Sequence, residues 1–256
     1  MDAPAGPFFF VHVMKTGGTT FISQIGDNFP PEAVYPSADV EPMKRIVAYM
    51  FLQPLQAQTP EQLGKIRLFR GHFPFLATTL VGPGVTTLTI VRDPVARTLS
   101  HLRHIKRGAQ VAGVSPTQRY KDMTLEEIYD DPLRFNGFIH NFQSKLFAMT
   151  AEDGITNCSD VLEVDDERLE LAKQNLASID VLGLSERHGE FVAEVRRRFG
   201  WKVDDIPNQQ VSTETWDASP EFRARIAREN AADMDFYAFA VQLYEQRLTS
   251  TISHRD

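Results

Sequence analysis

The sequence predicts an α/β protein in which helices flank a mostly parallel central sheet. Short apolar runs alternate with longer segments of helical periodicity, and two of the runs end in distinctive polar residues. Lys-Thr-Gly-Gly-Thr-Thr closely follows the first run, and Arg-Asp-Pro follows a later one. Apolar runs of about four to eight residues are typical of strands buried on both faces, and their alternation with helices is typical of parallel sheets. Because no repeat or composition break divides the chain, we expect a single domain over residues 1–256, with 1–7 flexible and 249–256 a tail.

Three strands are expected in the first half of the chain. The first is Phe8–Val13, an apolar run that ends shortly before Gly17 and Gly18. Thr19 or Thr20 is expected to cap the helix that follows. The other elements expected in this half are a helical turn at Glu61–Lys65 and strands at Ile66–Arg70 and Thr86–Val91.

The second half begins with a strong helix signal. Asp93 and Pro94 follow the third strand, and aspartate at the N-cap with proline at the first helical position favours a helix start. Residues 108–116 predict a loop. The remaining elements expected are helices at Thr124–Tyr129, Phe135–Met149, Asp166–Ser178, Glu186–Phe199 and Pro220–Leu248, and a strand at Val181–Leu184.

The composition narrows the class of protein. The chain is 42% hydrophobic and 24% charged, as in an ordinary soluble globular protein. A formal net charge of −7 argues against the broad basic surface of a nucleic-acid-binding protein, although a local basic pocket is compatible with it. Cys158 is the single cysteine, which excludes an intrachain disulfide and favours a cytoplasmic setting. No apolar run approaches about 18 residues and no cationic segment precedes the first run, so neither a membrane span nor a secretory signal is expected.

The loop after the first strand has the residues of an anion-binding site. Glycines let the backbone approach an anion closely, and the start of the following helix carries about +0.5 charge. A lysine adds a full charge and threonines add hydroxyl donors. An ordinary turn with a solvated lysine is the alternative. The candidate anion-binding residues are Lys15, Thr16, Gly17, Gly18, Thr19 and Thr20.

This loop is not a Walker motif. In the Walker sequence the lysine follows the glycines and a hydroxyl holds magnesium, whereas here Lys15 precedes them. The strand that ends at Val91 is followed by Arg92 rather than by an acidic metal ligand. The sequence therefore predicts a cationic pocket that works without a metal.

Arg92 belongs to a second candidate anion site. It lies at the carboxyl end of its strand, where ligands collect in open α/β sheets. On the next helix, Ser100 falls on a different face from the apolar Leu99 and Leu102, so Arg92 and Ser100 can hold a second phosphate. In the alternative, Arg92 pairs with Asp93 and Ser100 faces water.

Both motifs resemble those of sulfotransferases that use 3′-phosphoadenosine 5′-phosphosulfate (PAPS), most closely the branch of heparan sulfate 2-O-sulfotransferase and its bacterial relatives. MKTGGTT at residues 14–20 matches the family's PKTGGTT-like loop with methionine in place of proline, and RDPVARTLSHL at residues 92–102 matches its RDPxxRxxSxx element. The resemblance implies a P-loop-NTPase-like sulfotransferase fold without a metal. It also implies that the first loop binds the 5′-phosphosulfate, while Arg92 and Ser100 bind the 3′-phosphate.

Weaker similarities extend over most of the chain. FRGHF at residues 69–73 is similar to the family segment with the catalytic histidine, which implies His72 as the base. A histidine suits this role because its ordinary pKa is about 6.5, and Gly71 leaves room for a substrate. The alternative is that His72 is hydrogen-bonded in a turn. His12 alternates into the buried first strand, so we expect a structural role for it.

The expected function is transfer of the sulfuryl group from PAPS to a hydroxyl of a carbohydrate or small-molecule acceptor, by in-line displacement with Lys15 and His72 as catalytic residues and PAP as product. The acidic chain suggests a less charged acceptor than heparan sulfate, in a bacterial-type cytoplasm. Residues 108–120 and the proline-interrupted residues 30–60 are candidate lids. The aromatic side chains of Phe69, Phe73 and Phe75 either line an acceptor pocket or pack in the core. The alternatives are a P-loop kinase of a small molecule and a non-catalytic nucleotide-binding protein.

Overall fold

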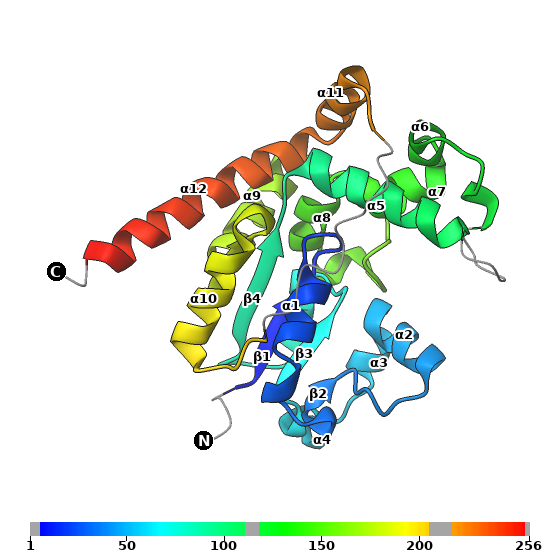
Figure 1. Ribbon diagram of the computed structural model, residues 1–256. Helices are drawn as coiled ribbons and strands as arrows, with labels where there is room; N and C mark the ends of the chain where they lie inside the picture. Colours follow the sequence, from blue (N-terminus) through cyan, green and yellow to red (C-terminus); the bar gives the residue numbers. More distant parts are fainter. Residues whose placement is uncertain (1–5, 111–117, 205–216, 254–256) are drawn as a thin grey trace.

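The computed structural model describes residues 6–110, 118–204 and 217–253, and a five-stranded parallel sheet lies at its centre (Figure 1). The strands are β1 (Phe8–Val11), β2 (Val34–Tyr35), β3 (Leu68–Gly71), β4 (Thr86–Val91) and β5 (Val181–Leu184). Their spatial order is β2-β3-β1-β4-β5, and every neighbouring pair is parallel. The predicted class, a mostly parallel sheet flanked by helices, is confirmed. Because β1 is central, the loops after β1, β3 and β4 emerge side by side at one edge.

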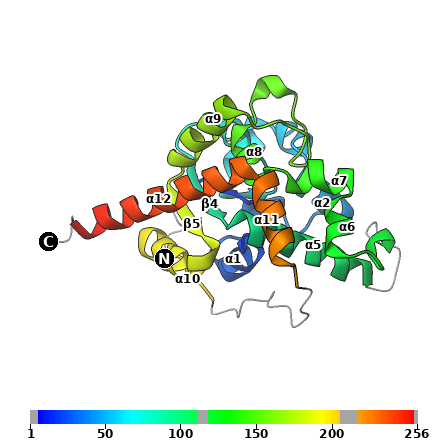
Figure 2. The same ribbon diagram turned by 90° about the horizontal axis from the view of Figure 1, so that it is seen from above.

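Helices cover both faces of this sheet (Figures 1 and 2). The α-helices of the described residues are α1 (Gly18–Gln24), α2 (Pro42–Met50), α3 (Gln53–Gln56), α4 (Pro60–Lys65), α5 (Pro94–Gln110), α6 (Leu125–Tyr129), α7 (Pro132–Arg134), α8 (Phe142–Ala148), α9 (Asp166–Ala177), α10 (His188–Phe199), α11 (Pro220–Glu229) and α12 (Ala231–Ser253). The later part of α12 extends beyond the other elements.

The residues of β1 alternate between the two helical layers. Phe9 and Val11 pack in a cluster with side chains of α8, α9 and α12, whereas Phe8 and Phe10 pack in a second cluster with α1 and α10. Successive strand residues point to opposite faces. Since both faces are covered, every residue of this strand is apolar rather than every second one.

The apolar residues of α5 are buried, and they pack against other helices instead of against the sheet. Leu99 and Leu102 pack in a third cluster with Ile128 of α6 and Phe222 of α11. The opposite face of α5 is therefore left to face the end of the sheet, where its polar residues lie.

The proline-rich residues 30–60 are more regular than we predicted. They contain β2, α2 and α3 rather than an interrupted loop. Pro42 stands in the first turn of α2, where no backbone N–H is required, and the Glu41 carboxylate accepts from the N–H groups of Met43 and Lys44 at 3.0 Å each. The prolines thus begin helices here instead of preventing them.

The single helix predicted over Phe135–Met149 is divided. A π-helical turn spans Phe135–Ile139, and Asn141 then adopts a left-handed backbone with φ of 45° before α8 begins. The apolar spacing that suggested one helix is real, because Ile139 and Phe142 are both fully buried. Continuous apolar spacing therefore does not require a continuous helix.

The long helix predicted over Pro220–Leu248 is also divided, at Asn230. The Asn230 side-chain oxygen accepts from the backbone N–H of Asn141 at 2.9 Å, and the Asn141 side-chain oxygen accepts from the N–H of Asp233 at 3.1 Å. Each break therefore supplies the hydrogen-bond partner for groups at the other break.

Candidate active site

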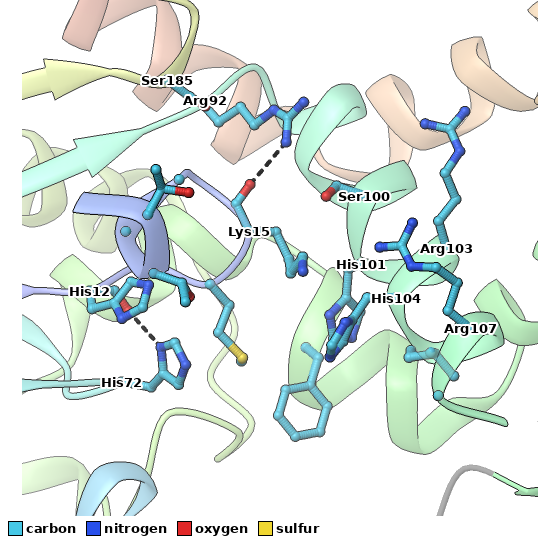
Figure 3. Close-up of a pocket in the computed structure, with 18 of the residues that line it drawn as sticks. His12, Lys15, His72, Arg92, Ser100, His101, Arg103, His104, Arg107 and Ser185 are labelled. Carbon is cyan, nitrogen blue, oxygen red and sulfur yellow. Dashed lines mark hydrogen bonds between the residues drawn. The ribbon is translucent and has the colours of Figure 1, made fainter. Parts of the chain in front are cut away.

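A cavity of about 910 Å³ opens at the carboxyl edge of the sheet (Figure 3). The residue that directly follows each of four strands lies in the cavity wall. These residues are His12 after β1, His72 after β3, Arg92 after β4 and Ser185 after β5. Open α/β sheets bind their ligands at this edge. The polar face of α5, which includes Ser100, forms another wall.

The two predicted anion-binding motifs meet in this cavity. All predicted site residues but one belong to its wall, namely Lys15, Gly17, Gly18, Thr19, Thr20, His72, Arg92 and Ser100. The exception is Thr16, whose side chain is fully buried and whose hydroxyl donates to the carbonyl of Val13 at 2.9 Å. This hydroxyl stabilises the loop from inside.

Gly17 and Gly18 are each required in the loop for a different physical reason. Gly17 has a φ of 94°, a left-handed conformation that glycine adopts without strain. A β-carbon on Gly18 would lie 2.3 Å from the ring of His12, so no side chain fits there. The neighbouring Lys15 also has a left-handed backbone, with φ of 70°. The loop is therefore pressed closely onto the side chain that follows β1.

Cationic side chains dominate the cavity although the whole chain is acidic. Arg103, Arg107 and Arg134 lie in the wall together with Lys15 and Arg92. Burial, and then the nearby charges of Arg107 and Arg92, lower the pKa of Lys15 to about 8. The Arg92 guanidinium donates to the carbonyl of Lys15 at 3.1 Å, which joins the two motifs directly (Figure 3). Such a pocket is complementary to an anion with two charged ends.

Arg103 and Arg107 lie in the cavity wall although neither belongs to the two predicted motifs. They follow Ser100 by roughly one and two helical turns of α5. In Figure 3 the Arg107 guanidinium points toward Lys15, whereas the Arg103 side chain extends away from Lys15. Helical spacing from Ser100 would have been the signal for them. His101 and His104 of α5 also line the cavity.

Gln143 of α8 holds the backbone of Arg92 in place. Its side-chain oxygen accepts from the Arg92 N–H at 3.0 Å, and its side-chain amide donates to the Arg92 carbonyl at 2.7 Å. Gln143 is fully buried. Nothing in its local sequence spacing indicates this contact, since the pair joins residues of two distant elements.

Asp233 of α12 in turn holds the start of α8. Its carboxylate accepts from the N–H of Gln143 at 3.1 Å and from the N–H and hydroxyl of Ser144 at 2.7 Å each. Burial raises the pKa of Asp233, and these hydrogen bonds oppose that rise. A buried network therefore connects α12 to Arg92.

His72 presents one ring nitrogen for proton transfer. Its Nδ1 hydrogen-bonds to the carbonyl of His12 at 2.8 Å, and because a carbonyl only accepts, Nδ1 must carry the proton. The lone pair of the neutral ring is then on Nε2. Burial lowers the pKa of His72 to about 4, so the ring is neutral near pH 7. A neutral ring is the form that can act as a base.

His12 lies directly beside His72, with ring centroids 4.4 Å apart. Its Nδ1 hydrogen-bonds with the hydroxyl of Tyr49 at 2.7 Å, and its ring stacks on Phe10. Burial lowers its pKa well below the ordinary value. These contacts fit the expected structural role, yet His12 also belongs to the cavity wall. His12 and His72 therefore form a pair of adjacent neutral histidines at the carboxyl end of the sheet.

The aromatic residues of β3 and of the segment that follows it pack in the core. Phe69 and Phe73 are fully buried in the cluster that contains Phe9, and Phe75 stacks on Phe147 at 5.7 Å. Of the two roles considered for them, the structure shows core packing.

The other candidate lid, residues 108–120, lies partly outside the described residues.

No group of three histidine, cysteine, aspartate or glutamate side chains in residues 6–110, 118–204 and 217–253 is placed to hold a metal ion. Within the same ranges, no helix is both long and apolar enough to span a bilayer.

The chain is similar to heparan-sulfate 6-O-sulfotransferases. Heparan-sulfate 6-O-sulfotransferase 1 of Homo sapiens is 28% identical over 93% of this chain, and 6-O-sulfotransferase 1-B of Danio rerio is 28% identical over 93%. The 3-B enzyme of Danio rerio is 29% identical over 62%. The alignments span 65%, 66% and 42% of these relatives, which is less than two thirds of each. No protein-family model matches the chain.

These similarities support a sulfotransferase family for the chain. The relatives are 6-O-sulfotransferases, and a place in the expected 2-O branch is not shown.

Proposed function

We propose that this protein is a sulfotransferase that moves the sulfuryl group of PAPS to a hydroxyl of a carbohydrate or small molecule. One observation carries the proposal, namely that two distant anion-binding motifs converge on one cationic cavity. The names of the relatives, all heparan-sulfate sulfotransferases, support sulfuryl transfer to a carbohydrate hydroxyl.

Each motif would bind one end of the nucleotide. In this proposal Lys15, Thr19, Thr20 and the backbone of Gly17 and Gly18 hold the 5′-phosphosulfate. The guanidinium of Arg92 and the hydroxyl of Ser100 hold the 3′-phosphate, with Arg103 and Arg107 adding positive charge nearby. Thr16 supports the loop instead of contacting the ligand, because its hydroxyl is bonded to Val13.

The transfer would be an in-line displacement at sulfur. The acceptor oxygen forms a bond to sulfur while the bond from sulfur to the 5′-phosphate oxygen breaks, and PAP leaves. Negative charge grows on the leaving phosphate, where the Lys15 ammonium stabilises it. The acceptor hydroxyl gives its proton to Nε2 of His72, which is neutral near pH 7 because its pKa is about 4.

His12 is the alternative base. It lies beside His72 and lines the same cavity, and its ring contacts the lysine loop at Gly18. We favour His72 because its Nδ1 bonds to a carbonyl and must therefore carry the proton. The lone pair of Nε2 can then accept the proton of the acceptor hydroxyl. In His12 the partner of Nδ1 is a hydroxyl, which can donate or accept, so the tautomer is undetermined.

The proposal is tested with nucleotide-free protein by calorimetry in the presence of a chelator. We expect PAP to bind and AMP, which lacks the 3′-phosphate, to bind at least tenfold more weakly. Incubation with PAPS and a panel of carbohydrate and phenolic acceptors should then yield a sulfated product.

Other results would support the rival functions. Magnesium-dependent phosphoryl transfer from ATP would identify a kinase. Tight PAP binding without transfer to any acceptor would identify a non-catalytic nucleotide-binding protein, and absence of PAP binding would exclude the proposed site.

A further inference from the structure

Helix α2 carries an apolar stripe that the described residues leave uncovered. Met43, Ile46 and Val47 are 63%, 57% and 41% exposed. Together with Met50 they occupy positions i, i+3, i+4 and i+7, so they share one face of the helix. A surface helix normally turns such a stripe toward the core, whereas the buried residue of α2 is the small Ala48. The stripe therefore faces outward.

One end of this stripe enters the active-site cavity. Met50, the last residue of α2, lies in the cavity wall together with Met14, His12 and His72. The apolar surface of α2 is thus continuous with the part of the site that contains the histidines.

Hydrogen bonds fix this end of α2 to both histidines. The Tyr49 hydroxyl bonds to Nδ1 of His12 at 2.7 Å, and the Tyr49 carbonyl accepts from the N–H of His72 at 2.9 Å. The Tyr49 ring also meets the His72 ring edge-on, with centroids 5.0 Å apart. The stripe is therefore held in a defined position relative to the proposed base.

The distribution of charged side chains in the cavity indicates where the nucleotide binds and where the acceptor binds. Arg92, Arg103 and Arg107 occupy the proposed nucleotide side of the cavity, with His101 and His104 near Arg107 (Figure 3). Met50 instead follows Tyr49, which bonds to His12 and His72. In an in-line displacement the acceptor approaches sulfur from the side opposite the leaving nucleotide. The acceptor then reaches the proposed base past Met50.

We infer that the acceptor is an amphiphile, whose hydroxyl reaches His72 while an aliphatic or aromatic segment lies along Met43, Ile46 and Val47. This inference rests on the proposed function and names its acceptor class. Exposed apolar surface beside a cavity is typical of ligand grooves, and flexible methionines adapt to ligands of different shape.

The inference is tested by calorimetry on full-length protein saturated with PAP. The ligands are methyl, butyl, hexyl and octyl β-glucoside, each below its micelle concentration. Burial of one methylene strengthens binding about fourfold when it is complete, so we expect about two- to fourfold per methylene along an open stripe. The M43Q/I46Q/V47Q variant should lose this dependence on chain length and retain its affinity for PAP.

Leu133→Gln provides the matched control. Leu133 is 61% exposed on α7, outside the stripe, so its replacement should leave the chain-length dependence unchanged. V47Q alone should weaken the dependence in part, which keeps the test valid if the triple variant does not fold.

Several outcomes would overturn the inference. A flat response to chain length in the natural protein would do so, as would the same dependence in the triple variant. If sedimentation velocity shows a dimer in the natural protein but not in the triple variant, the stripe binds a second copy of the chain instead of an acceptor. Flotation with phosphatidylglycerol vesicles that depends on the stripe would assign it to a membrane surface.

Failure of the inference and failure of the proposed function are separable. If PAP binds and sulfate moves to a heparan oligosaccharide without any effect of alkyl chains, the function stands and the amphiphilic acceptor is wrong. If PAP does not bind, the proposed function itself fails.

Discussion

The two sides of the cavity are built in opposite ways. On the side of Arg92, Gln143 bonds both backbone groups of Arg92, and Asp233 bonds the start of α8 that carries Gln143. On the α2 side, Met14 and Met50 lie in the wall with His12 and His72, and Tyr49 of α2 bonds to both of these histidines.

This difference matters for ligand selection. Donors held by a buried network have little freedom left to lose, so they can select one anion with a defined separation of charges. Apolar side chains with several rotamers accommodate ligands that differ in shape. We therefore expect the protein to be strict toward its sulfuryl donor and permissive toward its acceptor.

The largest effect is expected from loss of the base. Replacing His72 by alanine should lower kcat about 10²- to 10⁴-fold, because general-base assistance is removed, and leave PAP affinity within about twofold. Sulfate transfer under saturating PAPS and calorimetry with PAP measure the two effects. If His12→Ala abolishes transfer and His72→Ala does not, His12 is the base.

Loss of the loop lysine should affect both binding and rate. By analogy with the removal of one oxyanion donor, Lys15→Ala should cost about 2–4 kcal/mol of transition-state stabilisation, and PAP affinity should fall as well. Single-turnover transfer and calorimetry report these losses. An unchanged rate would remove Lys15 from the mechanism.

Removing Gln143 from the buried network should have a smaller effect, and one that is specific to PAP binding. Gln143→Met has a similar volume but cannot bond the Arg92 backbone, so we expect PAP affinity to fall about tenfold while kcat changes little. The ratio of PAP to AMP affinity should fall too, since only PAP carries the 3′-phosphate.

A matched variant separates this positioning role from general destabilisation. In Arg92→Ala protein, the Gln143→Met substitution should have no further effect on the PAP to AMP ratio. If the ratio is unchanged in Gln143→Met alone, the glutamine supports the fold and does not position Arg92.

The smallest expected effect is a dependence on pH. The pKa of Lys15 is about 8, below its ordinary value, so the free protein loses this charge as the pH rises through about 8. A bound anion favours the ammonium form and raises this pKa, so PAP affinity should be highest below about pH 8 and decline above it. Calorimetry between about pH 7 and 9.5 should show proton uptake on binding.

Lys15→Arg is the control for this assignment, because arginine stays charged throughout that range. Its PAP affinity should not change with pH between about 7 and 9.5. An equal decline in both proteins would assign the titration to another group.

The sequence pointed to most of the motif residues that line the cavity because the signals in these motifs are local. A run of apolar residues, a pair of glycines and an aspartate-proline helix start all depend on neighbours in the chain. The same reasoning failed at Asn141 and Asn230, where helical spacing continues although the helices do not. Each break depends on a hydrogen bond from the other segment, which no local pattern reports.

The acceptor side was the least predictable. Prolines in residues 30–60 suggested interrupted structure, but Pro42 starts α2 under the cap of Glu41. The apolar spacing of Met43, Ile46 and Val47 would ordinarily indicate a face turned to the core. Only the arrangement of α2 beside β3 and the histidines leaves this face outward.

The sequence by itself determined the class of fold, the buried first strand and the two motifs for an anion, because these depend on apolar runs and on backbone freedom at Gly17 and Gly18. The tertiary structure decided which residues share one cavity, which nitrogen of His72 is available and which face of α2 is exposed. The physical reason is that charge, proton position and exposure depend on groups that are near in space and distant in the chain.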